Sequence, residues 1–296
     1  MTAPASTGGP SPLSSEDAAR LAAEHGLERG GVRPPLWRYL KETWRQRQFM
    51  WTLSSAQSYA RNQDNYLGQL WAVLNPLLLA GAYFLIFGVL LGIDEGTTNY
   101  VAFLVIGLLL FMYSSGTMTS SAKSISGNLN LVRSLRFPRC VLPLSTTLTE
   151  FIAFLPSLAV IVVLTLVTGE PITVEWLLFP VAILLILMIN AGISLIVARL
   201  VHSSRDLRNL VPLLVRLLRY VSGVFFSITA YAGEGLLGTV MLYQPFALVL
   251  DIARQALLEE AAINPVSWLV AVGWAIVLPV VGMIFFWRAE ATYGRN

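Results

Sequence analysis

Residues 100–119 read YVAFLVIGLLLFMYSSGTMT. This run carries no charge and has the roughly 20 residues that a helix needs to cross a bilayer. Comparable apolar runs recur along the chain, and we expect transmembrane spans at residues 70–92, 100–119, 141–167, 176–200, 210–232 and 266–287. Hydrophobic residues make up 55% of the sequence and charged residues 12%, about half of their usual share in soluble domains. The sequence therefore predicts an all-α integral membrane protein with six transmembrane helices.

Before the first span, the sequence predicts an amphipathic helix that is too polar to cross a membrane. Trp37, Trp44 and Trp51 fall on one helical stripe, and basic residues such as Arg38 lie on another face. Indole rings and arginine both favour the headgroup level, so we expect this helix to lie in the membrane interface. Packing on a soluble partner is the alternative.

The first 33 residues are rich in Ala, Ser, Pro and Gly and contain no apolar core segment. Such a composition predicts a disordered cytosolic tail that precedes a membrane domain at 34–296. The basic start and apolar run of a secretory signal are not found in it.

The segment 233–265 is partly apolar, but it is interrupted by Pro245 and charged at Asp251 and Arg254. It is too short and too charged to span, and such segments are tolerated at membrane depth when they pack against protein or line a cavity. We expect a re-entrant helical hairpin that turns near Tyr243 to Pro245.

The segments that connect the spans are alternately rich in basic residues and rich in acidic residues. With the amino terminus in the cytosol, all 20 lysine and arginine residues except Arg254 fall on the cytosolic side or at its edge. This pattern predicts a multi-pass protein of the cell membrane with both termini in the cytosol.

The sequence contains none of the common catalytic or phosphate-binding motifs. GxxxxGK[ST], GxSxG, HExxH and CxxC are all missing, and His25 and His202 are too few for a metal cluster. Cys140 is the only cysteine, so no intrachain disulfide can form. We therefore expect a transport protein that is not an enzyme, has no cofactor or metal, and draws energy from another subunit.

Three stretches carry a resemblance to a known family: RNQDNYLGQLWAVLNPLL at 61–78, NLNLVRSLRFPRCVLP at 128–143 and YQPFALVLDIARQALL at 243–258. The chain resembles the permeases of ABC type-2 polysaccharide exporters, which move O-antigen, teichoic acid or galactan on a polyprenyl diphosphate. In the third stretch the family usually has Asn-Pro, where this chain has Gln244 and Pro245.

The resemblance implies that residues 34–296 form a permease domain that homodimerises and binds two copies of an ABC ATPase subunit. Its cargo would be a lipid-linked polysaccharide, and nucleic acid is not an expected partner. The 18 arginines against 2 lysines, together with the tryptophan-bearing interface helix, lead us to favour an actinobacterial cell-wall galactan.

A loop at 123–143 is polar and basic. In similar exporters such a loop docks in a groove of the ATPase through a coupling helix, which we place at 128–136. The candidate coupling residues are Asn128, Arg133, Arg136 and Phe137. A basic loop that only anchors the topology is the alternative.

Aromatic side chains in the spans could line the cargo path, because their faces stack on sugar rings and their hydroxyls form hydrogen bonds. The conduit candidates are Tyr83, Phe84, Phe111, Tyr113, Tyr220, Phe225 and Phe226. For each of them, packing against lipid or a neighbouring helix is the alternative. The hairpin is expected to close the outer end of the conduit through Tyr243, Pro245, Phe246 and Leu250.

Arg216 and Arg219 lie three residues apart on one helical face. Charge within a span usually pairs or serves a function, and guanidinium groups bind phosphate oxygens in a bidentate manner. We consider both arginines candidates for binding the carrier diphosphate, with snorkelling or pairing to Glu150 as the alternative.

Two other functions are alternatives for a chain of this kind. A membrane-embedded glycosyl- or phosphotransferase would need paired acids near the cytosolic surface. The acids expected there beyond the tail, Glu42, Asp64, Asp206 and Glu290, are all far apart in sequence, which disfavours it. A drug or lipid exporter of the same ABC class would share the topology and stays open.

Overall fold

The computed structural model describes residues 34–60, 70–90, 97–135, 137–204, 206–232 and 235–293, together with Gly92 and a few positions before residue 25. Within these ranges the secondary structure is helical and contains no strand. The prediction of an all-α membrane protein is confirmed. The motif residues 61–69, as well as Arg136 and Arg205, lie outside the described residues.

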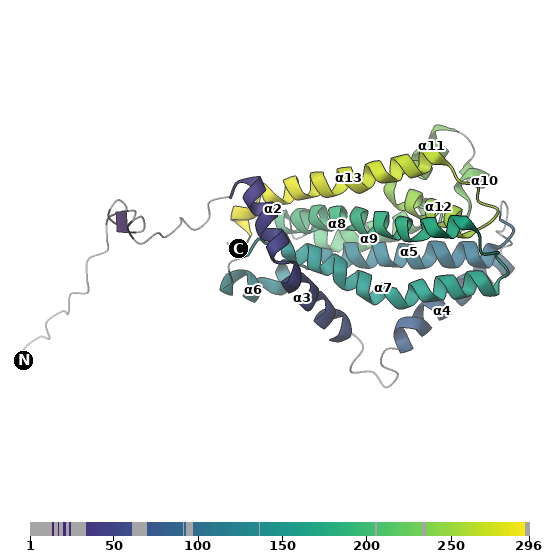
Figure 1. The fold of residues 1–296 in the computed structure, drawn as a ribbon, viewed down its shortest axis with the longest axis horizontal. Coiled ribbons are helices and arrows are strands. Elements are labelled where there is room, and N and C mark those ends of the chain that lie inside the picture. Colours follow the sequence, from purple (N-terminus) through teal and green to yellow (C-terminus); the bar gives the residue numbers. More distant parts are fainter. Residues whose placement is uncertain are drawn as a thin grey trace, which may run out of the picture.

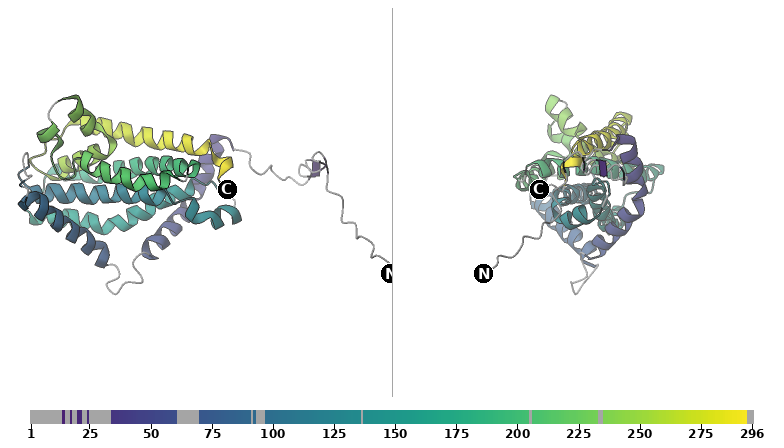
Figure 2. Two further views of the ribbon diagram at one scale, coloured as in Figure 1. Left: turned by 180° about the vertical axis from the view of Figure 1, so that it is seen from behind. Right: turned by 90° about the vertical axis from the view of Figure 1, so that its left-hand side faces the viewer.

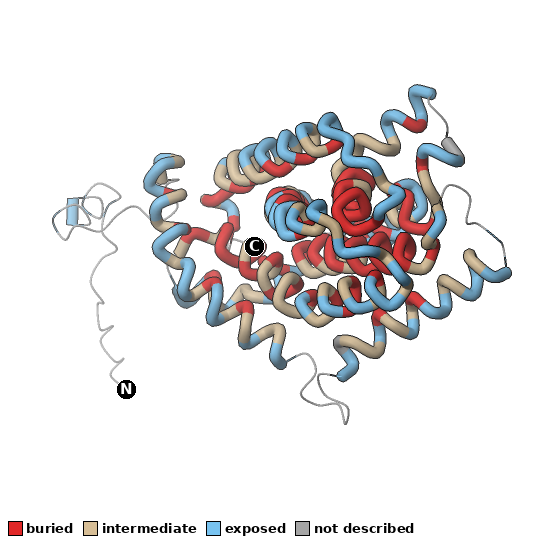
Figure 3. The backbone as a smooth tube through the Cα atoms, turned by 45° about the vertical axis from the view of Figure 1, so that its right-hand side comes forward, coloured by how far each residue is buried: buried red, intermediate tan, exposed pale blue. Residues whose placement is uncertain are grey.

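Five helical segments are long and apolar enough to cross a membrane: Val73–Leu90, Tyr100–Ser121, Val141–Val167, Val174–Ser203 and Pro265–Trp287. They are formed by α4 (Trp71–Tyr83) with the π-helical turn Phe84–Leu90, α5 (Tyr100–Ser121), α7 (Val141–Val167), the 3-10 turn Val174–Leu178 with α8 (Phe179–Ser203), and α13 (Pro265–Trp287). Most of these helices run along the long axis of the molecule (Figure 1). α5 is buried over most of its length, and the buried residues gather in the middle of the bundle (Figure 3).

The two ends of the bundle hold different elements (Figures 1 and 2), and their side chains differ in charge. One end carries α2 (Leu36–Arg45), α3 (Arg47–Ala60), α6 (Leu129–Ser134) and the 3-10 turn Glu290–Thr292. We call it the basic end, for Lys41, Arg133 and Arg288. The opposite end, which we call the acidic end, holds α10 (Ile228–Ala232), α11 (Leu236–Tyr243) and α12 (Pro245–Leu257) together with Glu170 and Glu259.

The predicted interface helix consists of two helices, because a turn at Gln46 separates α2 from α3. Trp37 and Trp44 are exposed by 79% and 69%, whereas Tyr39 and Thr43 on the opposite side are buried against the bundle. Trp287 Nε1 donates a hydrogen bond to the carbonyl of Pro34 at 2.8 Å. The amino-terminal helix and the end of α13 therefore lie together at the basic end.

The predicted fifth span at 210–232 is not one continuous helix, which corrects that boundary. α9 (Leu207–Val221) ends before Gly223, whose φ of +64° is the left-handed conformation that favours glycine. The helix resumes only with α10 at Ile228. The chain nevertheless traverses the bundle here, since the Tyr100 hydroxyl at the acidic end donates to the carbonyl of Phe225 at 2.8 Å.

The predicted pair of short helices in the re-entrant region is present. α11 and α12 meet at Gln244 with a bend of 77°, and Pro245 is the first residue of α12. Proline fits the first turn of a helix because the amide that it lacks has no partner there. If this bent pair is taken as one broken span, the candidate spans number six.

α8 and α13 approach each other closely through two glycines. A Cβ built on Gly282 of α13 would lie 2.6 Å from the Gly192 carbonyl oxygen of α8, and one on Gly192 would overlap the backbone of Leu278 and Pro279. Small residues of this kind let membrane helices approach closely. We expect Gly192→Ala to lower the free energy of unfolding by about 1–3 kcal/mol through overpacking, seen as a lower Tm of the detergent-solubilised protein.

The control is Gly273→Ala in α13, where an added Cβ has nothing within 4 Å. An equal Tm for both variants would show that α8 and α13 do not pack this closely.

Candidate functional site

The basic loop contains the expected short helix. A 3-10 turn at Ser126–Asn128 leads into α6, which ends at Ser134, two residues short of the predicted boundary. Arg133 is exposed and Val132 is buried, so α6 is anchored by its apolar side and presents its basic side outward. The predicted coupling residue Arg136 lies outside the described residues.

The other two predicted coupling residues hold the loop in place. Asn128 Nδ2 donates to the carbonyl of Ser124 at 2.8 Å. The Phe137 ring lies 5.8 Å from that of Phe49 in α3, and the adjacent Pro138 is buried. α6 is therefore connected to the bundle through a short segment that packs on α3.

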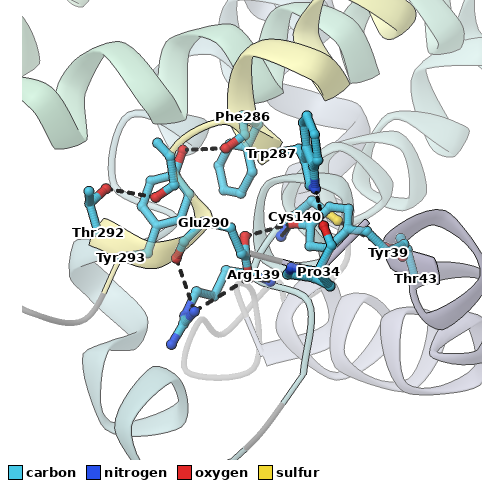
Figure 4. A network of polar contacts seen from close by, with 11 residues as sticks. Pro34, Tyr39, Thr43, Arg139, Cys140, Phe286, Trp287, Glu290, Thr292 and Tyr293 are labelled. Atoms are coloured by element: carbon cyan, nitrogen blue, oxygen red, sulfur yellow. Dashed lines mark hydrogen bonds and ion pairs between the residues drawn. The ribbon is translucent and has the colours of Figure 1, made fainter. Parts of the chain in front are cut away.

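Directly after this segment, four residues join three distant parts of the chain in what we call the junction: Tyr39, Arg139, Cys140 and Glu290 (Figure 4). The Tyr39 hydroxyl donates to Glu290 Oε2 at 2.7 Å and accepts from the Cys140 amide at 3.2 Å. The Arg139 amide donates to Glu290 Oε1 at 3.0 Å, and its guanidinium donates to the Glu290 carbonyl at 3.0 Å. One buried carboxylate thus links α2, the start of α7 and the turn after α13.

The environment of the junction favours neutral side chains. Burial raises the pKa of Tyr39 and of Glu290, and for Glu290 the hydrogen bonds from Arg139 and Tyr39 oppose that rise. Burial also raises the pKa of the Cys140 thiol to about 12, against the hydrogen bond with Thr43 at 3.1 Å. The thiol is therefore both protonated and enclosed at neutral pH.

Sequence reasoning missed the junction. In the sequence Glu290 is an isolated acid and Tyr39 carries no signal of its own, because 251 positions separate the two residues. The only local signal is an acid directly after the last span, where basic residues dominate.

Several predicted conduit residues come together around Arg219. The Phe225 ring lies 4.8 Å from that of Tyr83 and 5.7 Å from that of Tyr220. Arg219 donates from Nη1 to the Tyr83 hydroxyl at 3.1 Å, and its guanidinium lies 5.8 Å from the Phe111 ring centre. These five residues form what we call the Arg219 cluster, in which phenol and guanidinium groups meet aromatic faces.

The remaining candidates for conduit and diphosphate binding lie elsewhere. Tyr113 stacks on Phe154 of α7 with ring centres 5.2 Å apart, in the core of the bundle. Phe84 and Phe226 are partly buried against the same core. Arg216 is exposed, so the two arginines of the predicted pair occupy different environments.

The predicted gate residues fix the bend between α11 and α12. The Tyr243 carbonyl accepts a hydrogen bond from Trp274 Nε1 of α13 at 3.0 Å. Phe246 and Leu250 are buried, and the Phe246 ring lies 6.3 Å from that of Phe111. The bend is thereby attached to α13 and to the Arg219 cluster.

In the described part of the chain, no group of three or more His, Cys, Asp or Glu residues could hold a metal ion.

Fold and site together define a polytopic helical membrane protein with a short exposed basic helix at one end. The chain belongs to the ABC-2 type transporter family, whose model matches residues 36–258. It is therefore a transporter permease, as the resemblance implied.

Relatives of known name agree with this assignment. The chain is 27% identical over 256 residues to the O-antigen export system permease protein RfbA of Myxococcus xanthus, covering 86% of this chain and 95% of the relative. It is 28% identical to a protein of the same name from Klebsiella pneumoniae, over 76% of this chain and 86% of the relative. Identity to the polysialic acid transport protein KpsM of Escherichia coli is 22%, with the same coverage.

The junction makes a testable prediction through the single cysteine. Tyr39→Phe leaves the Glu290 carboxylate and the Cys140 amide without the Tyr39 hydroxyl, at a cost of about 1–3 kcal/mol. Local opening should become roughly tenfold more frequent or more. We expect N-ethylmaleimide to label Cys140 faster by that factor in the purified variant, followed by mass spectrometry.

The matched control is Tyr59→Phe, because Tyr59 on α3 is 61% exposed. The double variant with Glu290→Gln should raise labelling by less than the product of the two single effects, since both changes act on the Tyr39–Glu290 contact. Unchanged labelling in Tyr39→Phe would refute the role of this hydroxyl.

Proposed function

We propose that the chain is the permease subunit of an ABC exporter that carries a polyprenyl-diphosphate-linked polysaccharide from the cytosol to the outer face of the cell membrane. The observation that carries this proposal is that relatives matched over most of the chain are named as permeases for O-antigen export or as a polysialic acid transport protein. Galactan is the cargo that we favour, with O-antigen and teichoic acid as other polymers of the same kind.

The basic end faces the cytosol in this proposal, and the acidic end faces outward. The charge difference between the ends supports this orientation, because lysine and arginine are retained on the cytosolic side of membranes. Both termini are then cytosolic, since Pro34 contacts Trp287 at the basic end.

Two copies of a separate ATPase provide the energy, and a homodimer of this chain forms the transporter. α6 is the docking helix: it is short, exposed at Arg133 and fixed to the bundle through Phe137. A displacement of α6 would also move the junction, because Arg139 and Cys140 follow closely after Phe137 in the chain. The hydrogen bonds of Glu290 would transmit this displacement to α2 and to the end of α13.

The cargo path in this proposal runs along the Arg219 cluster. A sugar polymer needs walls that combine aromatic faces with hydrogen-bonding tips, and Tyr83, Tyr220 and Phe225 combine both. Arg219 is partly buried beside them and binds the carrier diphosphate, with the exposed Arg216 as a second contact. Tyr220 and the apolar face of α9 beside it are exposed on the single chain, as expected for a wall shared between two copies.

A drug or lipid exporter is the second candidate, because topology and ATPase docking would be the same for either cargo. The names of the relatives favour the polysaccharide. A glycosyl- or phosphotransferase is disfavoured, since the structure uses Glu290 in the junction rather than in an open site.

The proposal is tested by Arg133→Glu in the host cell. Reversing the charge on α6 should reduce the ATPase recovered with the permease at least about tenfold, as expected for a disrupted interface charge. Export should stop, and polyprenyl-linked saccharide should accumulate inside the cell. ATPase co-purification and analysis of extracted lipid-linked saccharide measure the two effects.

Arg288→Glu is the control, because Arg288 is an exposed arginine at the same end but lies after α13. Normal ATPase recovery in Arg133→Glu would contradict docking through α6. Loss of the ATPase without accumulation of lipid-linked saccharide would favour the drug or lipid exporter.

A further inference from the structure

The acidic end contains a cavity of about 210 Å³ between the break Ser222–Ser227, α10 and α12. It is lined by none of the residues predicted for the conduit, the diphosphate or the gate. The polar side chains in its wall are Thr97, Ser222, Ser227, Thr229, Asp251, Arg254, Gln255 and Glu260. Sites for drug-sized ligands usually measure about 300–1,000 Å³, so this cavity has room for one small ring.

Two polar groups in the cavity wall, on Ser222 and Asp251, can form further hydrogen bonds. Ser222 is 1% exposed, and its hydroxyl has no hydrogen-bond partner in the described residues. Asp251 accepts a hydrogen bond from Gln255 Nε2 at 2.8 Å, whereas a carboxylate offers about four acceptor positions. Buried polar groups are normally satisfied, so these groups point to a ligand that carries hydroxyls.

The charges in the wall favour a neutral ligand. The Arg254 guanidinium is occupied by the carbonyls of Phe103, Gly223 and Val224, and no ion pair joins it to Asp251 among the described residues. Its positive charge disfavours a metal cation in the same space. The carboxylates of Asp251 and Glu260 in turn repel a phosphate.

We propose that this cavity binds one neutral sugar unit of the exported polymer at the outer end of the permease, through Ser222, Asp251 and Gln255. Sugar hydroxyls donate to the Asp251 carboxylate, and they accept from the Ser222 hydroxyl and from the second N–H of Gln255 Nε2, whose first N–H is bound to Asp251. Aliphatic side chains such as Ile228 and Leu258 complete the wall and can contact the C–H face of a ring. The assignment of this sugar to the cargo rests on the proposed function.

The test uses D-galactose as the probe and the purified full-length chain, with binding measured by saturation-transfer difference NMR. The wild-type protein should give a saturable signal. Asp251→Asn and Ser222→Ala should each weaken the apparent affinity about tenfold. Ala261→Leu, which fills the cavity without removing a polar group, should weaken it as well.

Glu175→Gln is the matched control, because this exposed carboxylate lies at the same end but outside the cavity, and its binding curve should equal that of the wild type. Equal affinity in all variants, or displacement of galactose by calcium chloride or inorganic phosphate, would overturn the sugar site.

Export measured in cells that carry Ser222→Ala shows whether the ligand of the cavity is a sugar unit of the exported polymer or a free sugar. Slower polymer export with normal ATPase recovery supports the cargo assignment, whereas normal export despite lost galactose binding contradicts it. Because the binding assay needs neither the ATPase nor the polymer, its failure is distinct from a failure of the proposed function.

Discussion

The guanidinium of Arg254 holds together the part of the bundle where helical hydrogen bonding is interrupted. In a membrane interior each backbone carbonyl needs a donor from the protein, because lipid supplies none. Between Ser222 and Ser227 the chain leaves the helix, and Arg254 donates to the carbonyls of Gly223 and Val224 at 2.9 and 3.2 Å. It also donates to the Phe103 carbonyl of α5 and lies 3.4 Å over the Phe103 ring. Gly107 is required beside it, since a Cβ there would overlap the guanidinium.

This contact fixes one end of the permease, and in our proposal the junction lets the other end respond to the ATPase. At the acidic end, α5, the break and α12 are joined through buried atoms around the proposed sugar cavity. At the basic end, α6 projects from the bundle, and the Glu290 carboxylate joins the segment after α6 to α2 and to the end of α13. The Arg219 cluster adjoins the break through Phe225. Such an arrangement suits export in our proposal, because motion begins at the ATPase side while the outer end keeps its shape.

Span boundaries could be predicted from the sequence because bilayer thickness determines the length of uncharged helical runs. α7 occupies the predicted residues 141–167, and α5 extends the prediction by two residues at its end. The break after Val221 escaped prediction because Gly223 to Phe226 are as apolar as a span, and the donors come from elsewhere in the chain. The same limit applies to the site. Arg219 and Tyr83 could be proposed from residue type, whereas the separation of Tyr113 from them, and the pairing of Tyr39 with Glu290, depend on tertiary packing.

The thermal stability of Arg254→Gln measures the central claim most directly. A glutamine amide has two N–H donors and cannot bind all three carbonyls. The variant therefore leaves at least one buried carbonyl without a donor, and each such carbonyl lowers the free energy of unfolding by about 1–3 kcal/mol. We predict a Tm several degrees below that of the wild type in the same detergent, and below that of Arg208→Gln, which changes an exposed arginine of α9. A Tm for Arg254→Gln equal to that of Arg208→Gln would show that the break is held by other contacts.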